Sequence, residues 1–231
     1  MHVWRLVCFV ALAVAFSSGA RAQQDSDTVR QFWPEVDFYV PLNEKFRLFF
    51  LATITKNEET RDNTEGQVGA HIDYHLNRKV SLRTGYRHGF SLGGDDTFKE
   101  HRIIFEQTLR QPLPLEVLLS DRNREDLRWV NGEFSARYRN RVTLEREFKI
   151  LNRPVTPYGS AEVFYDSRFQ TWNRNRLAVG AQIAFKRGAP LISLIHPKKQ
   201  LVLDVYLMRQ NDSRSQPSRV KAVGIAFSIY F

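Results

Sequence analysis

Cysteine is almost absent from this chain of 231 residues, which has a single one, Cys8. Because Cys8 lies in an N-terminal apolar run that is expected to be removed, we predict a mature chain without cysteine. Disulfide frameworks, thiol catalysis and zinc–thiolate sites are therefore excluded. Beyond the N-terminus, no apolar run approaches the roughly 18 residues that a membrane-spanning helix needs. This excludes a helical membrane protein, but it leaves open a membrane barrel, whose alternating strands escape hydropathy windows.

The sequence also has no glycine-rich phosphate loop, nucleotide-binding pattern or nucleic-acid module. One cluster has metal-ligand chemistry, namely His71, Asp73 and His75. On a strand these residues share a face, but successive side chains are roughly 7 Å apart, too far for adjacent ligands to one metal ion. We therefore expect a hydrogen-bond network at these residues, and we predict no metal, no cofactor and no nucleic-acid partner.

The N-terminus has the pattern of a secretory signal peptide. Basic residues precede an apolar run from Leu6 to Phe16, and a small-x-small site follows at residues 20–22. This predicts export with cleavage before Gln23, giving a signal peptide at 1–22 and one domain at 23–231. An uncleaved anchor helix is the alternative, but the apolar run is short for one. Export of the whole 23–231 domain is thus expected.

Charge is unbalanced toward the basic side, with 34 Lys and Arg against 25 Asp and Glu. Removal of Arg5 and Arg21 with the signal peptide leaves 32 basic groups against 25 acidic ones, a net charge of +7. On an exported protein whose basic residues are spread along strands, such an excess favours contact with anionic lipid head groups over nucleic acid.

Hydrophobic and polar residues alternate along the whole mature chain. Val68, Ala70 and Ile72 oppose Gln67, Gly69 and His71, for example, and the same period of two recurs in later segments. Eleven strands are expected, at 31–40, 45–55, 66–76, 80–90, 98–110, 116–129, 133–148, 157–166, 173–186, 200–209 and 219–231. Because single-chain bacterial barrels usually have an even number of strands, we expect 12, with 10 as the alternative, and 116–129 is the least regular segment.

Alternating strands fit either a soluble sandwich with its apolar face inward or a membrane barrel with that face outward. Strand length, the contrast between short turns and longer polar loops, and aromatic residues near strand ends favour the barrel. The expected short turns are 41–44 and 77–79, and the expected longer loops are 57–65, 91–97 and 211–218. The aromatic residues are Trp33, Phe50, Tyr74, Phe90, Trp129, Tyr158, Trp172, Tyr230 and Phe231.

The end of the chain carries a further sign of a membrane barrel. Apolar residues occupy every second position and finish on the last residue, in the order Val223, Ile225, Phe227, Ile229 and Phe231. This pattern resembles the C-terminal recognition signal of outer-membrane proteins. An ordinary terminal strand is the alternative interpretation. The resemblance implies the barrel-assembly machinery and periplasmic chaperones as partners during biogenesis.

If the apolar parity faces lipid, the other parity lines the lumen, where charges of both signs are dense. Arginine dominates over lysine, and its fixed fork of donors suits dehydrated carboxylate pairing. We therefore predict a salt-bridged, largely plugged lumen, with an anion-attracting channel as the alternative. The predicted charge network comprises Arg122, Arg124, Arg137, Arg139, Arg141, Glu145, Glu162, Asp166, Arg174 and Arg176. Glu100, Arg102, Glu106, Asp126 and Arg128 share this inward parity.

Several segments resemble a family of predicted outer-membrane barrels known only as domain of unknown function 2490. They are residues 121–126 (Asp-Arg-Asn-Arg-Glu-Asp), 137–141 (Arg-Tyr-Arg-Asn-Arg), 161–164 (Ala-Glu-Val-Phe), 175–180 and 206–212, followed by the terminal Phe231. The resemblance covers most of 31–231. It implies a barrel fold and no particular activity.

A lipid hydrolase is a third hypothesis, because such enzymes carry Ser and His on the lipid-facing side of a barrel. His88 and His101 have the outward parity and flank a loop that begins at Ser91. No compact His-x-Ser motif is present, however, so these three residues are weak candidates and enzymatic activity is not favoured.

Taken together, the sequence predicts an all-β, up-and-down transmembrane barrel in the outer membrane of a Gram-negative bacterium. Its expected role is structural or envelope-binding, with outer-membrane lipid and lipopolysaccharide as partners.

Overall fold

The computed structural model describes residues 28–57, 64–93, 98–151, 153–185 and 200–231. The expected signal peptide lies outside them. The described residues form one sheet of twelve strands and a short 3-10 turn at Pro114–Glu116. The strands are β1 (Thr28–Pro41), β2 (Phe46–Asn57), β3 (Thr64–His75), β4 (Val80–Ser91), β5 (Lys99–Leu113), β6 (Val117–Val130), β7 (Glu133–Arg146), β8 (Phe148–Ile150), β9 (Arg153–Asp166), β10 (Thr171–Phe185), β11 (Gln200–Asp212) and β12 (Arg219–Tyr230).

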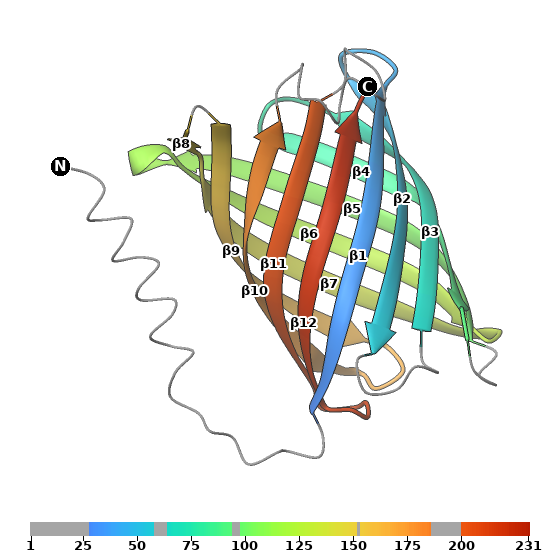
Figure 1. Ribbon diagram of the computed structural model, residues 1–231. Helices are drawn as coiled ribbons and strands as arrows, with labels where there is room; N and C mark the ends of the chain where they lie inside the picture. The colour runs from blue at the N-terminus through green and yellow to red at the C-terminus, as the bar shows by residue number, and fades with distance from the viewer. Residues whose placement is uncertain (1–27, 58–63, 94–97, 152, 186–199) are drawn as a thin grey trace, which may run out of the picture.

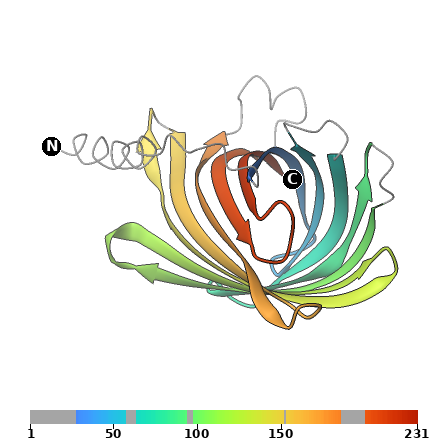
Figure 2. The ribbon, with the colours of Figure 1, turned by 90° about the horizontal axis from the view of Figure 1, so that it is seen from below.

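The sheet closes into a barrel (Figures 1 and 2). Neighbouring long strands pair antiparallel, and β1 pairs with β12 in parallel, from Thr28 with Arg219 to Tyr39 with Tyr230. The sheet has the twelve strands that we expected, but β8 is a three-residue strand that pairs only with the start of β9. Eleven described strands therefore form the closed ring. Because successive strands of the ring alternate in direction and their number is odd, the first strand, β1, and the last, β12, run in the same direction. Their pairing, which closes the barrel, is therefore parallel.

Polar and apolar side chains are distributed inside out relative to a soluble protein. Leu177, Val179 and Leu207 on the outer face are 58%, 58% and 60% exposed, whereas Asp126 and Asp166 in the interior are 1% and 0% exposed. A sheet that turns its large apolar side chains outward and buries its charges is stable only where lipid covers the outside. The fold is therefore the predicted transmembrane barrel.

Aromatic side chains gather on the outer face near both rims, as the girdles of a membrane barrel do. At one rim Trp129 contacts Phe134, with ring centroids 5.2 Å apart, and at the other Phe46 stacks on Tyr74 at 4.9 Å. Three residues predicted for the girdles lie elsewhere, because their parity points inward: Trp33, Tyr158 and Tyr230 line the lumen.

The connections divide between two rims. The loop rim, at the bottom of Figure 1, carries the connections after β2, β4, β6, β9 and β11, and the turn rim carries those after β1, β3, β5, β8 and β10. The predicted longer loops all belong to the loop rim and the predicted short turns to the turn rim. The connection 186–199 is an exception, since it joins strand ends at the turn rim and has 14 residues. No helix among the described residues is long and apolar enough to cross a membrane.

Candidate functional site

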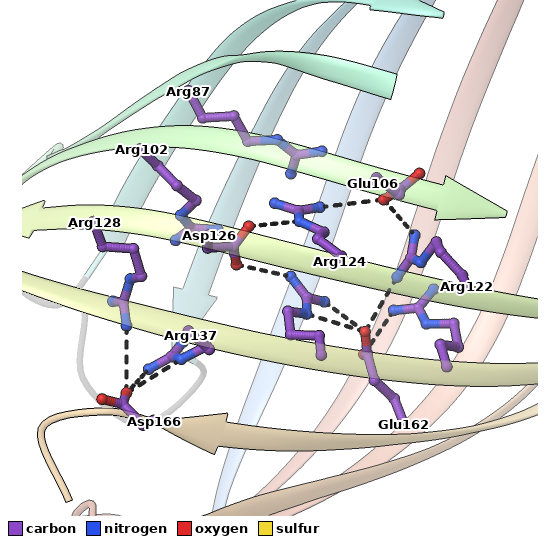
Figure 3. Close-up of polar contacts among 12 residues, drawn as sticks. Arg87, Arg102, Glu106, Arg122, Arg124, Asp126, Arg128, Arg137, Glu162 and Asp166 are labelled. Atoms are coloured by element: carbon purple, nitrogen blue, oxygen red, sulfur yellow. Dashed lines mark hydrogen bonds and ion pairs between the residues drawn. The ribbon is translucent and has the colours of Figure 1, made fainter. Parts of the chain in front are cut away.

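A continuous network of ion pairs covers one wall of the lumen, on strands β5, β6, β7, β9 and β10. Figure 3 shows part of it. Nine guanidinium groups share five carboxylates, so the network carries four more positive than negative charges. The arginines are Arg102, Arg122, Arg124, Arg128, Arg137, Arg139, Arg141, Arg168 and Arg176, and the acids are Glu100, Glu106, Asp126, Glu162 and Asp166.

Glu162 on β9 is the centre of this network. Its carboxylate accepts ion pairs from Arg139 and Arg141 at 2.8 Å, from Arg122 at 3.1 Å and from Arg176 at 3.6 Å. The residue is only 2% exposed. Register explains the convergence, because Arg141 on β7 and Arg176 on β10 are the cross-strand neighbours of Glu162. One buried carboxylate thus neutralises one of four guanidinium charges.

Two further acids connect the cluster around Glu162 to the rest. Asp126 binds Arg124 at 2.6 Å and lies 3.8 Å from both Arg102 and Arg139, while Glu106 lies 3.7 Å from Arg122. Several buried guanidinium nitrogens have no hydrogen-bond acceptor among the described residues, namely Nε of Arg102, Arg122, Arg141 and Arg176 and one Nη of Arg124. The network therefore has unused guanidinium donors in addition to an excess of positive charge.

The network ends near the loop rim at Asp166. Arg137 and Arg168 bind its carboxylate at 2.7 and 2.9 Å, and Arg128 lies 3.6 Å away and also binds Glu100. Arg168 belongs to the turn after β9, and its hydrogen bond to Asp166 raises the pKa of its guanidinium. The sequence analysis did not predict Arg168, because alternation identifies inward residues only within strands and Arg168 lies in a turn.

The network leaves part of the lumen open. A cavity of about 730 Å³ remains, lined by nine arginines and five acids. The basic wall bears the network, whereas the opposite wall bears Glu35, Asp37 and Asp204 from β1 and β11. Aromatic rings stabilise the guanidinium groups between the walls: Arg176 lies 4.9 Å from the Trp33 ring centroid and 5.2 Å from that of Phe164. The interior is salt-bridged as predicted, but it is not filled.

Arg87 on β4 borders this network and has no carboxylate partner within 4 Å among the described residues. Figure 3 shows its side chain beside the network, with no interaction drawn to the other residues. Its Nε donates a hydrogen bond to Nε2 of His71 at 3.2 Å. Asp73, the next inward residue, binds Arg83 at 2.5 Å and Arg47 at 2.7 Å. His71 and Asp73 thus join the polar interior, and no group of metal-ligating side chains is found in the described ranges.

Two predicted members of the network lie outside it. Arg174 binds Asp212 of β11 at 2.5 Å, in a separate pair near the loop rim. Glu145, near the turn-rim end of β7, makes no ion pair with any described residue, because its cross-strand neighbours are Leu118 and Tyr158. The other eight predicted residues are joined.

A second polar cluster, which the sequence analysis did not foresee, lies on the outer face of β6 and β7. Nδ2 of Asn140 donates hydrogen bonds to Asp121 at 2.6 Å and to Asn123 at 3.0 Å, and the Tyr138 hydroxyl donates to Asn123. These residues interrupt the apolar parity of β6, which explains why 116–129 was the least regular segment. It is nevertheless a full strand.

The three catalytic candidates are not brought together. His88 and His101 are cross-strand neighbours on the outer face, with ring centroids 4.8 Å apart, and Tyr86 bonds to Nδ1 of His101. Ser91 has the inward parity and lines the cavity, and its hydroxyl donates to the Gly93 carbonyl oxygen at 2.9 Å. The expectation that Ser91 lies beside the histidines is therefore wrong, since the sheet separates them.

The C-terminal apolar residues have the outward parity expected from the sequence, and their role as an assembly signal stays a prediction. Val223 and Phe227 on β12 are 39% and 40% exposed on the lipid face, while the alternate residues Val220, Ala222 and Ala226 are buried. Phe231 follows β12 and contacts Phe38 at the turn rim, with ring centroids 6.5 Å apart.

Comparison with known proteins identifies the family. Residues 30–221 match the model described as "Protein of unknown function (DUF2490)", so the chain belongs to this family. No curated protein matches the sequence. Among solved structures, the fold is similar to the beta domain of the Bordetella autotransporter Brka, at a TM-score of 0.43 and 15% identity over 81% of this chain and 82% of that one.

Proposed function

We propose that this protein is an outer-membrane barrel that binds small anions in its lumen. The observation that supports the proposal is the excess of arginine at the cavity, which nine arginines and five acids line, and where Glu162 alone is shared by four guanidinium groups. A protein interior normally pairs its buried charges, so an uncompensated cluster beside an open volume indicates an exogenous anion. Planar guanidinium forks suit phosphate and carboxylate groups in particular.

The outer membrane as its location is supported by the apolar belt, the two aromatic girdles and the outward apolar residues of β12. Bacterial barrels with these features fold into that membrane. Within the envelope, a barrel with an anion site in its lumen would be a binding protein rather than a purely structural one.

Isothermal titration of residues 23–231, refolded in an uncharged detergent, with inorganic phosphate tests this proposal. Arg141→Gln and Arg122→Gln remove guanidinium groups whose side chains are 29% and 23% exposed, and each is expected to weaken phosphate binding about tenfold. Arg47→Gln is the matched control, because Arg47 is a luminal arginine that pairs with Asp73 away from the cavity lining. Absence of binding by the wild type, or an equal loss in the control, contradicts the proposal.

A second candidate is a small anion-selective pore, which the open volume of about 730 Å³ favours. Conductance across a planar lipid bilayer separates the two functions. A pore would give a current whose reversal potential under a salt gradient indicates anion selectivity, and Arg141→Gln would reduce that selectivity. A binding barrel would give no such current while retaining phosphate affinity.

A further inference from the structure

A row of exposed cations crosses the outer face near the loop rim. Arg209 on β11, Lys221 on β12 and Arg30 on β1 are direct cross-strand neighbours, and all three are exposed. Like charges in such positions are roughly 5 Å apart and repel one another. Within the described part of the chain, none of the three forms a hydrogen bond or ion pair through its side chain. The sheet thus holds an arrangement that a bound anion would stabilise.

Two more cations extend this row. Arg219 lies at the rim on β12, beside Asn211 of β11, and Lys56 lies near the loop-rim end of β2. We call Arg30, Lys56, Arg209, Arg219 and Lys221 the cationic sector. The outward parity of β10, β11, β12, β1 and β2 contains no acidic residue in the described ranges. Arg30, Arg209 and Lys221 therefore have no counter-charge on their own face among the described residues.

The cationic sector lies between an apolar surface and a polar groove, the arrangement that an amphipathic lipid at a membrane interface requires. Toward the middle of the barrel, the outer face becomes apolar at Leu207 and Val223, which are 60% and 39% exposed. Toward the rim, a groove of about 690 Å³ is lined by Trp172, Asn175, Arg209, Asn211 and Arg219. Asp212, the one carboxylate lining it, is bound to Arg174 at 2.5 Å. Acyl chains and a charged head group would thus find separate, adjoining surfaces.

Aromatic residues are fewer where these cations lie. At the same rim, β4 to β7, β9 and β10 present aromatic or histidine side chains outward, among them His88, His101, Trp129 and Trp172. Across β11, β12, β1 and β2 the outward charged residues near this rim are all basic, and Phe32, the cross-strand neighbour of Lys56, is the aromatic residue among them. Aromatic belts serve any bilayer interface, whereas a local block of cations selects phosphate-rich head groups.

We propose that the cationic sector binds the head group of a multiply phosphorylated glycolipid in the leaflet at the loop rim. Three adjacent cations in one row, with two more beside them, match more than one phosphate on a single head group. The amides of Asn175 and Asn211 and the ring of Trp172 offer sugar contacts within the groove. This site is on the opposite side of the sheet from the luminal network and is independent of anion binding there.

The test measures lipid binding to the full mature chain in an uncharged detergent by native mass spectrometry. The probes are the bis-phosphorylated glucosamine disaccharide lipid A, its dephosphorylated form, and pyrophosphate as a free anion. The wild type is expected to bind the phosphorylated lipid at least tenfold more tightly than either of the others. Equal binding of the two lipids, or pyrophosphate binding as tightly as the lipid, would overturn the proposal.

Variants then locate the binding. Arg209→Gln combined with Lys221→Gln is expected to weaken binding of the phosphorylated lipid about 30-fold. Lys99→Gln combined with Lys149→Gln removes the same charge from exposed positions outside the sector and is expected to change the affinity less than about twofold. Arg209→Lys keeps the positive charge at this exposed position. It should therefore retain most of the affinity if charge is what binds the lipid. A similar loss in both double variants would overturn the proposal.

Discussion

At the scale of the residue, Glu162 is the acid that pairs with the most arginines in the luminal network. Its carboxylate lies within 3.6 Å of four guanidinium groups and is almost completely buried. Removing one partner of a buried ion pair is costly because the remaining charges stay buried without compensation. Glu162 should therefore affect both the stability of the barrel and the charge that the cavity presents to an anion.

We predict that Glu162→Gln lowers the free energy of unfolding by about 3 kcal/mol, since four arginines lose their shared counter-charge. Urea unfolding of the refolded barrel in micelles measures this. Glu145→Gln is the control, with an expected change under about 1 kcal/mol, because Glu145 has no ion pair among the described residues. Equal changes in the two variants would show that the network does not stabilise the fold.

Two strand glycines allow a matched comparison of packing. A Cβ atom at Gly224 would lie only 2.0 Å from the Tyr206 ring, whereas one at Gly159 would meet nothing within 4 Å. We expect Gly224→Ala to destabilise the barrel by about 2 kcal/mol through displacement of that ring, and Gly159→Ala to be neutral or slightly stabilising. The same urea titration measures both. If Gly224→Ala were as neutral as Gly159→Ala, the Tyr206 ring would not lie across β12.

At the scale of the element, the closing pair β1 and β12 differs most from expectation. Antiparallel neighbours and an even count are usual for bacterial barrels, yet these two strands run in parallel from Thr28 to Tyr39. Local sequence has little influence on this choice, because alternation along a strand is the same whichever neighbour it pairs with. The eleven alternating segments of the sequence are the eleven strands of the closed ring, and the short β8 is the twelfth strand of the sheet.

A cysteine pair tests the parallel closure. Val36 and Phe227 are direct partners across β1 and β12 and face the lipid, so Val36→Cys with Phe227→Cys places the Cα atoms near the separation that a disulfide requires. Oxidation should join them, as thiol labelling after denaturation would show. Val36→Cys with Val223→Cys, offset by four residues, should stay reduced. Efficient joining of the offset pair, and not of the direct one, would contradict the register.

Strand β6 was expected at 116–129 as the least regular of the strands, and the structure gives the reason. Its inward parity follows the arginine and aspartate pattern, but its outward parity carries Asp121 and Asn123, which bond to Asn140 of β7. Polar residues on both faces remove the period of two in hydropathy. Charged residues at every second position, from Arg122 to Arg128, are the remaining sign of a strand.

At the scale of the whole molecule, stability depends on lipid or detergent, because the exposed large apolar side chains far outnumber the buried ones. We predict that residues 23–231 refolded in micelles migrate faster on a gel without boiling than after it, since a closed barrel resists the denaturing detergent. The control is the same sample kept in urea, which should migrate alike in both conditions. Identical mobility of the refolded sample would contradict a closed barrel.

The sequence by itself determined the membrane barrel, the expectation of export and the inward parity of most charged residues. These follow from strand geometry, since successive side chains point to opposite faces whatever the rest of the chain does. Eight of the ten predicted network residues are joined for this reason. Parity also indicated the outward apolar face of β12, with Val223 and Phe227 among its exposed residues.

Only the tertiary structure decided which strands are neighbours, and with that the parallel closure, the four partners of Glu162 and the separation of Ser91 from the histidines. It also decided that Arg30, Lys221 and Arg209, nearly 200 residues apart along the chain at the extremes, form one row. Register between distant strands depends on packing and closure of the whole sheet, which no local period encodes.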